Sequence, residues 1–153
     1  MLMGTWRDAQ WDVARWPNFS ARELSCHCGG RYCSGQYFHD PDFLDALQKV
    51  RTGVNRSVHI TSGHRCALWN AAVGGAALSQ HKAMAVDISL AGQDPLKLVE
   101  ECIAAGFNGF GFGRSFLHID RRRRPARWDY GRVSRALWLT NLEGHPWQTF
   151  LRA

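Results

Sequence analysis

The stretch Leu78–Ile88, with the sequence LSQHKAMAVDI, carries a histidine and an aspartate on either side of a short apolar run. Over residues 86–90, apolar side chains alternate with Asp87 and Ser89. Such alternation predicts a strand that buries one face and presents the carboxylate on the other. His81 and Asp87 are therefore expected to offer polar ligand atoms from a segment whose other face lies in the core.

A second stretch, Phe116–Asp120 with the sequence FLHID, has the same alternating character. His118 and Asp120 share one face of this predicted strand, and the two aliphatic residues beside His118 share the other. Two histidines and one carboxylate on neighbouring strands, here His81, His118 and Asp87, form the ligand set of a catalytic zinc with water at its fourth position. Taken alone, the pattern also fits histidines that only pack and hydrogen-bond in a core.

Length and composition indicate one globular domain. The chain has 153 residues, enough for a single core, with 45% hydrophobic and 21% charged residues. It contains no apolar run long enough to cross a membrane. Because the segment Met1–Asp8 lacks the apolar core of a secretory signal, we expect synthesis in the cytoplasm without a signal peptide.

The net charge favours a polyanionic partner surface. The formal charge is +6 at pH 7, and Arg121–Arg124, closed by Pro125, is the densest basic run. This run is interpreted either as a solvated turn or as a surface attracted to an anionic cell wall. No recognised nucleic-acid-binding motif accompanies the charge, so we expect no specific nucleic-acid partner.

Local signals outline the remaining elements. Asp40-Pro41 and Asp94-Pro95 each place a capping aspartate before a proline at the first helical position. Residues 58–61 alternate as a strand. Phenylalanine and glycine alternate over residues 107–113, which predicts a strand against which a substrate backbone can lie closely.

Three tryptophans recur near the start of the chain. Trp6, Trp11 and Trp16 are five residues apart, a period that fits neither an ideal helix nor a strand. We expect an irregular arm that packs against the domain. Stacking of these rings on sugar faces is the alternative.

A cysteine-rich segment spans residues 26–33, with the sequence CHCGGRYC. Its cysteines can hold a structural metal together with His27 or His39, or form a disulfide with Cys66 in an oxidising compartment. The chain has five cysteines, so one must stay unpaired if disulfides form. Cys102, on the face of a predicted helix, is the natural candidate.

Several blocks of the chain resemble, in the same order, the zinc D-Ala-D-Ala carboxypeptidase family. They are Ser62–Cys66 (SGHRC), Asn70–Ala76 (NAAVGGA), Ser79–Asp87 (SQHKAMAVD) and Phe116–Asp120 (FLHID). This group of cell-wall peptidases includes many phage endolysins and shares its fold with the hedgehog signalling domain. The resemblance extends from about Phe19 to Trp128. Within the first block, His64 stands where the family usually has tyrosine, and we expect a packed side chain there rather than a metal ligand.

The resemblance implies a set of site residues. Zn²⁺ would be held by His81, Asp87 and His118. The arginine of the first block, Arg65, would bind the substrate, because a planar guanidinium holds a terminal carboxylate through two parallel hydrogen bonds. A structural ion pair is the alternative for Arg65. Ser79 matches a family serine that contacts the peptide.

The chain departs from the family pattern at two further positions. Five residues separate His81 from Asp87, where the family usually has six including a glycine, so either the turn is tighter or the metal geometry is altered. Ser115 occupies the place three residues before the last histidine, where many members carry an acidic base. Asp120 is then the candidate general base, or alternatively the carboxylate that orients His118.

We therefore expect an α+β single domain of the hedgehog/DD-peptidase type. A small central antiparallel sheet would carry helices on one side and the zinc in an open groove. Residues 1–18 would form the tryptophan-containing arm, residues 19–128 the zinc peptidase domain, and residues 129–153 a C-terminal extension packed on the domain.

The expected activity is zinc-dependent hydrolysis of peptide bonds in the D-amino-acid-containing stem peptides of peptidoglycan. We expect a monomeric phage or prophage endolysin that reaches the anionic wall after release from the cytoplasm. The alternative is a non-catalytic zinc-containing domain that binds wall peptide or a protein partner. The residues do not distinguish a carboxypeptidase from an endopeptidase.

Overall fold

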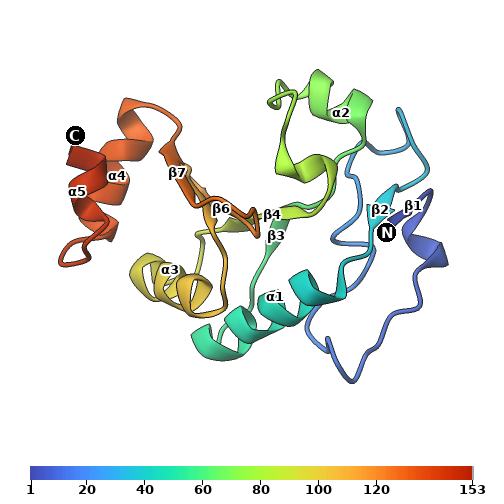
Figure 1. Cartoon of the computed structure of the whole chain (residues 1–153), viewed down its shortest axis with the longest axis horizontal. Helices are drawn as coiled ribbons and strands as arrows, with labels where there is room; N and C mark the ends of the chain where they lie inside the picture. Colours follow the sequence, from blue (N-terminus) through green and yellow to red (C-terminus); the bar gives the residue numbers. More distant parts are fainter. Residues whose placement is uncertain (153) are drawn as a thin grey trace.

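The expected strand around Asp87 is β4, the second strand of a five-stranded sheet in the computed structural model, which describes residues 1–152 (Figure 1). The strand order is β3-β4-β6-β5-β7. The bounds are Ile60–Ser62 for β3, Ala85–Ser89 for β4, Gly109–Phe112 for β5, Phe116–Asp120 for β6 and Ala126–Asp129 for β7. Together with five α-helices, this sheet confirms the expected α+β class.

The pairing of β4 with β6 brings the two polar stretches together. The strands are antiparallel, and Asp87 lies directly opposite His118. Residues opposite each other in an antiparallel pair share a face of the sheet, so both side chains project to the same side. The aliphatic residues on either side of each project to the other face and are fully buried; they are Val86, Ile88, Leu117 and Ile119.

One edge of the sheet differs from the expected antiparallel arrangement. Strand β7 pairs with β5 in parallel, whereas the other pairs are antiparallel. The reason is topological, because β4 and β5 already occupy both edges of β6. After the turn at residues 121–125, the chain must cross to the outer edge of β5.

Two helices cover the apolar face of the sheet. Helices α1 (Pro41–Val54) and α3 (Pro95–Ala104) pack against each other and lie on the same side of the strands (Figure 1). The side chain of Asp40 accepts the N–H of the third helical residue of α1, and Asp94 does the same for α3. These caps confirm the two helix starts predicted from the Asp-Pro pairs.

Side chains from both layers meet in one core. They come from the helices and from the apolar face of the strands, and all are at most 1% exposed: Phe43, Leu44, Leu47, Val50, Val86, Ile88, Leu98, Val99, Leu117 and Ile119. Burial of side chains this large stabilises a fold by about 1.5–3 kcal/mol each. This core holds β4 and β6 rigidly beneath their polar side chains.

Short elements lie on the polar side of the sheet. Helix α2 (Ala67–Ala72) lies on the opposite side from α1 and α3 (Figure 1). The 3₁₀ helix η2 (Gln80–Lys82) contacts both α2 and β4. The chain between β3 and β4 therefore lies over the polar face of the sheet.

The N-terminal arm is packed on the domain at Trp16. It contains β1 (Leu2–Met3), which pairs with β2 (Tyr37–Phe38), and the 3₁₀ helix η1 (Trp6–Asp8). Trp16 is only 2% exposed, and its Nε1–H donates to Asp45 of α1 at 2.9 Å. The buried position of this ring favours packing over sugar stacking.

The C-terminal helices close the β5 end of the sheet. Helix α4 (Arg132–Asn141) is followed by α5 (Gln148–Arg152). Trp138 of α4 is fully buried, stacks near Phe112 with 4.9 Å between ring centroids, and donates Nε1–H to the Gly113 carbonyl at 2.7 Å. The tail therefore contributes a large side chain to the main core.

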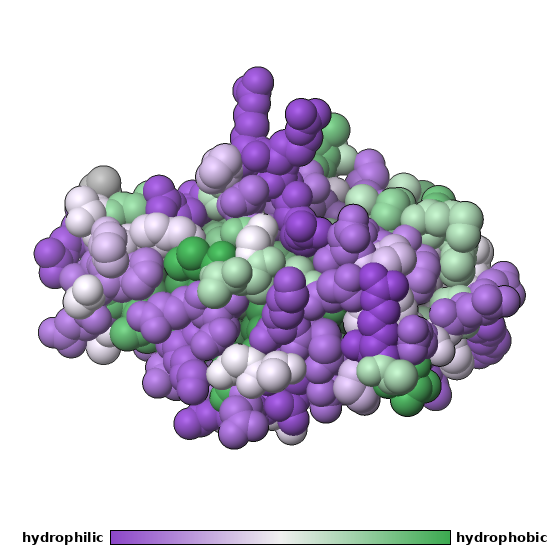
Figure 2. All heavy atoms as spheres, turned by 60° about the horizontal axis from the view of Figure 1, so that its bottom comes forward, coloured by the Kyte–Doolittle hydropathy of each residue, from purple (hydrophilic) through white to green (hydrophobic). Residues whose placement is uncertain are grey.

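One face of the molecule is mostly hydrophilic (Figure 2). Figure 2 shows one face on which hydrophilic side chains predominate and apolar residues form small, scattered groups. Among residues 1–152, no helix has both the length and the apolar character that a membrane crossing requires.

Replacement of Trp138 tests the structural role of the tail. Trp138→Ala removes a buried indole and leaves the Gly113 carbonyl without its donor, so we expect a loss of about 3–5 kcal/mol in the free energy of unfolding. Urea denaturation followed by circular dichroism measures this loss. Val133→Ala, at an exposed position of the same helix, is the control and should change stability by less than about 0.5 kcal/mol. Equal midpoints for the two variants would contradict the packing role.

Candidate metal centre

Three ligand atoms converge on the polar face of the sheet. His81 Nε2 lies 3.1 Å from Asp87 Oδ1 and 3.0 Å from His118 Nδ1, and His118 Nδ1 lies 3.0 Å from Asp87 Oδ1. All three residues are buried, at 3%, 7% and 4% exposure. They come from η2, β4 and β6, and they are the three residues expected to bind zinc. The group can hold one metal ion.

The outer nitrogen of each ring has its own acceptor. His81 Nδ1 lies 2.7 Å from the Gly63 carbonyl, and His118 Nε2 lies 2.7 Å from Asp120 Oδ2. A carbonyl and a carboxylate only accept, so the outer nitrogen of each ring is the donor in these contacts. The inner nitrogens face each other and the Asp87 carboxylate, and it is here that a bound metal ion would take their lone pairs.

This donor set fits a divalent cation. Two lone pairs and one carboxylate oxygen about 3 Å apart repel one another unless a positive charge lies between them. In a tetrahedral site with zinc–ligand bonds of about 2.1 Å, the ligand atoms lie about 3.4 Å apart. This is only a few tenths of an ångström longer than the sides of the observed triangle. Small side-chain rotations therefore suffice to admit the ion.

Asp87 is in the anionic form that a metal ligand needs. Burial by itself would raise the pKa of this carboxyl, but the hydrogen bonds with His118 and His81 outweigh it and hold the pKa below its ordinary value. Its second oxygen, Oδ2, lies 3.5 Å from the guanidinium of Arg65. Asp87 is thus ionised at neutral pH.

The short spacing between His81 and Asp87 is accommodated by a tight turn. Ala83 leaves η2 with φ −111° and ψ −108°, which redirects the chain into β4 within a few residues. His64 Nδ1 donates to the Ala83 carbonyl at 2.7 Å, and Nε2 lies 2.9 Å from the side-chain amide of Gln36. Burial lowers the pKa of His64, so its ring is neutral. His64 is a packed side chain, as expected, and it supports the turn between the two ligands.

The position of Asp120 favours the orienting role over the general-base role. Its carboxylate is fully buried and accepts from His118 and from two nitrogens of Arg122, at 2.8 and 2.6 Å. Burial alone would raise the pKa of Asp120, but Arg122 and His118 hold it below its usual range. The carboxylate lies behind His118, on the side of the ring away from the ligand triangle, so it fixes which nitrogen faces the metal.

Glycines in β5 make room for this arrangement. A Cβ at Gly109 would lie 2.2 Å from Asp120 Oδ1, and one at Gly111 would lie 2.7 Å from the Tyr130 hydroxyl and 2.8 Å from Trp128 Nε1. The expectation that a substrate backbone lies against these glycines is therefore wrong. The carboxylate of Asp120 and the side chains of Trp128 and Tyr130 already cover that face.

The ligand triangle opens into a cavity of about 510 Å³. The cavity is lined by residues that sequence reasoning placed at the site and by others that it did not: Arg65, Val73, Gly74, Gly75, Ala76, Leu78, Ser79, Gln80, His81, Asp87, Phe116, His118, Arg122, Trp128 and Tyr130. The expected substrate residues Arg65 and Ser79 are both in this wall. Arg65 also contacts Ser62 and Asn70 through long hydrogen bonds of 3.3 and 3.4 Å.

Arg122, Trp128 and Tyr130 are the lining residues that sequence reasoning missed. Arg122 belongs to the basic run that was treated as one unit, yet its guanidinium stacks over Trp128 at 4.8 Å and reaches Asp120. The ring of Trp128 lies 5.1 Å from that of His118. Gly111 was the one sequence feature that could have indicated them, because a glycine in a strand leaves space for a large neighbouring side chain.

A comparison with protein families agrees with this geometry. The family described as Peptidase M15 matches residues 17–120, a span that contains all three candidate ligands, Arg65 and Asp120. No curated protein matches the chain.

Asp120→Asn tests the orienting role. The amide keeps the size of the side chain but weakens the hydrogen bond from His118 and the ion pair with Arg122, so we expect zinc to bind about 10–100-fold more weakly. Competition with a chromogenic chelator measures this affinity. Asp45→Asn is the matched control: it breaks a similar two-bond pair between Asp45 of α1 and Arg15 of the N-terminal arm, and it should bind zinc as wild type does. Unchanged affinity in Asp120→Asn would exclude the orienting role.

Proposed function

The chain belongs to the peptidase M15 family, and from this premise we propose that it is a zinc-dependent peptidase that cleaves D-amino-acid-containing stem peptides of peptidoglycan. The observation that carries the proposal is the buried triangle of His81 Nε2, Asp87 Oδ1 and His118 Nδ1 at the base of a cavity. Three protein ligands and one open side distinguish a catalytic zinc site from a closed structural one.

His81, Asp87 and His118 would hold the zinc. When bound in such a site, zinc polarises a carbonyl and makes water a better nucleophile near neutral pH. The protein residues keep the donors aligned before substrate arrives: Gly63 and Asp120 fix the two rings, and the sheet register fixes Asp87 beside His118. Prior alignment of this kind removes the cost of arranging the ligands during the reaction.

Arg65 is suited to bind an anionic group of the substrate. Its guanidinium lines the cavity, is only partly exposed, and contacts Asp87 at 3.5 Å, a long distance for an ion pair. A substrate carboxylate offers two oxygens in the plane of the guanidinium and is a better partner than this single contact. Ser79, in the same wall, adds a hydroxyl toward the peptide.

We further propose that the protein acts on the cell wall as a phage or prophage endolysin. Its positive charge suits an anionic wall surface, and Arg121, Arg123 and Arg124 of the basic run are exposed. These three arginines stand beside the cavity-lining Arg122, so a polyanionic wall polymer would be held next to the site.

A non-catalytic zinc domain that binds wall peptide is the second candidate. Ser115 stands where many family members carry an acidic base, and among the described residues that line the cavity the one carboxylate is Asp87, itself a candidate ligand. A domain with the ligand triangle but without a base would bind zinc and peptide without turnover.

Digestion of isolated sacculi distinguishes the two. We expect purified protein to release peptide fragments, to stop when a chelator is added, and to lose activity at least 100-fold in His118→Ala, because that variant lacks one of three ligands. Mass spectrometry of the fragments identifies the bond. Binding to sacculi with retained zinc and no release from any wall type would support the non-catalytic domain.

Arg65→Ala tests substrate binding. Loss of the guanidinium should raise KM about 10–100-fold for a peptide with a free terminal carboxylate, since a hydrogen bond to a charged group contributes about 1.5–3 kcal/mol. Steady-state hydrolysis is measured together with zinc content, which should stay at the wild-type level. Arg56→Ala, which removes an exposed arginine outside the cavity, is the control. If Arg65→Ala has wild-type kinetics, Arg65 does not bind substrate and acts only as an ion-pair partner of Asp87.

A further inference from the structure

A second group of metal-binding side chains lies away from the ligand triangle. The Sγ atoms of Cys26, Cys28, Cys33 and Cys66 all lie within 4.8 Å of one another, and Cys28 Sγ is 3.5 Å from Cys33 Sγ. Three of the four residues are buried and Cys33 is half-buried. We propose that these cysteines form a structural zinc site with four thiolate ligands, independent of the proposed catalytic centre.

The sulfur positions agree with a closed tetrahedral site. Four sulfurs about 2.3 Å from a central zinc lie about 3.8 Å from one another, which is within the observed separations. With four protein ligands no position remains for water, so such a site stabilises structure and does not catalyse. Binding replaces the thiol protons, which pass to solvent, and yields four thiolates around one Zn²⁺.

Backbone N–H groups already point at the sulfurs. Cys66 N–H donates to Cys26 Sγ at 3.4 Å, Trp69 N–H to Cys66 Sγ at 3.4 Å, and Gln36 N–H to Cys33 Sγ at 3.3 Å. Donors around a ligand sulfur stabilise negative charge on it and orient it toward the metal. These donors would stabilise the negative charge on the sulfurs once a zinc ion displaces the thiol protons.

The loop that carries three of the cysteines is shaped by glycines. Gly29 and Gly30 have φ of 68° and 84°, and Gly35 has φ of 78°, conformations that side-chain-bearing residues rarely adopt. These turns fold the segment back on itself, so that Cys28 and Cys33 face each other across it.

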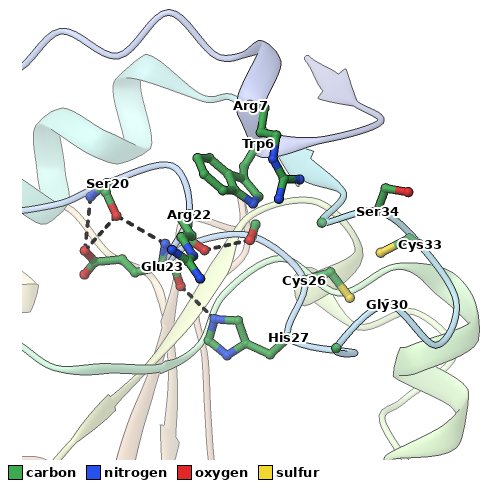
Figure 3. A pocket seen from close by; sticks show the side chains of 13 residues that line it. Trp6, Arg7, Ser20, Arg22, Glu23, Cys26, His27, Gly30, Cys33 and Ser34 are labelled. Atoms are coloured by element: carbon green, nitrogen blue, oxygen red, sulfur yellow. Dashed lines mark hydrogen bonds between the residues drawn. The ribbon is translucent and has the colours of Figure 1, made fainter.

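Positive charge lies beside the cysteines. Four thiolates and one Zn²⁺ carry a net charge of about −2. A cavity of about 650 Å³ has Cys26, Cys33, Arg7 and Arg22 in its wall, and Figure 3 shows these four side chains. Both guanidinium groups lie over the Trp6 ring, 4.7 and 5.7 Å from its centroid, so positive charge lines the same cavity as two of the ligand sulfurs.

The nearby histidines are engaged elsewhere. His27 Nε2 lies 2.9 Å from the Glu23 carbonyl, as Figure 3 shows, and His39 Nδ1 lies 3.0 Å from the Tyr37 hydroxyl. Of the two alternatives raised by the sequence, a histidine ligand and a disulfide to Cys66, the structure shows neither; Cys66 is a free thiol in the group and would be the fourth ligand. Cys102 is fully buried on α3, outside the group.

The proposed site would connect two distant segments next to the substrate arginine. Cys66 caps the N-terminus of α2 and directly follows Arg65, whereas the other three ligands lie 33 to 40 residues earlier in the chain. Zinc at this point would join the N-terminal segment to the wall of the catalytic cavity. The backbone of Arg65, next to Cys66, would then be held in place.

Metal counting tests the proposal. We expect protein purified under reducing conditions to contain two zinc ions per chain by elemental analysis and native mass spectrometry. Cys28→Ser/Cys33→Ser and His118→Ala should each contain one, and Cys102→Ala, the matched control, should contain two. A single zinc in wild type that is lost entirely in His118→Ala would overturn the proposal, as would two disulfides among these four cysteines in the reduced preparation.

Cobalt identifies the ligands and covers the case in which the double cysteine variant fails to fold. Protein produced in cobalt-supplemented medium should show a sulfur-to-cobalt charge-transfer band in wild type and in His118→Ala, because only the cysteine site has thiolate ligands. Absence of the band from a cobalt-loaded His118→Ala protein would refute thiolate coordination. Loss of wall hydrolysis with the band intact would count against the proposed catalytic function alone.

Discussion

The close passage of residues 62–66 against the backbone of Leu24 is the constraint on which the candidate site depends. A Cβ at Gly63 would lie 2.5 Å from the Leu24 carbonyl oxygen, so a residue with a side chain cannot occupy this position without a backbone shift. His64 N–H donates to the same carbonyl at 2.9 Å. With the segment held there, the Gly63 carbonyl faces His81 Nδ1 and sets the tautomer of that ring.

Successive residues of this segment support different parts of the site. His64 holds the turn between the first two ligands, and Arg65 contributes both its backbone N–H, which donates to the His81 carbonyl at 2.6 Å, and its guanidinium near Asp87. Cys66 belongs to the four-cysteine group. A neutral hydrogen bond contributes only about 0.5–1.5 kcal/mol to stability, but a misoriented ligand weakens metal binding about 10–100-fold. The segment therefore contributes both to folding and to the orientation of the residues that would hold the metal.

Period-two patterns explain why the faces of β4 and β6 could be predicted from sequence, since alternation along a strand decides which side chains are buried. The pairing of Asp87 with His118 could not be predicted locally, because register depends on both strands and on the turns that join them. The tail around Trp138 gave little signal because α4 begins without a side-chain cap and the core contact of Trp138 is made with a distant strand. Arg122 could not be distinguished from the neighbouring arginines by sequence, because only the folded position of this turn before β7 brings its guanidinium to Asp120.

The two aspartates of the site are paired with arginines in different ways, and the difference agrees with different roles. Arg122 binds Asp120 through two short contacts, the closer at 2.6 Å, and stacks on Trp128, which makes the pair part of the wall. Arg65 meets Asp87 at 3.5 Å through one oxygen. Once a cation in the triangle compensates the charge of Asp87, this long contact contributes little. The guanidinium of Arg65 is then available to a carboxylate in the cavity, whereas that of Arg122 remains bound.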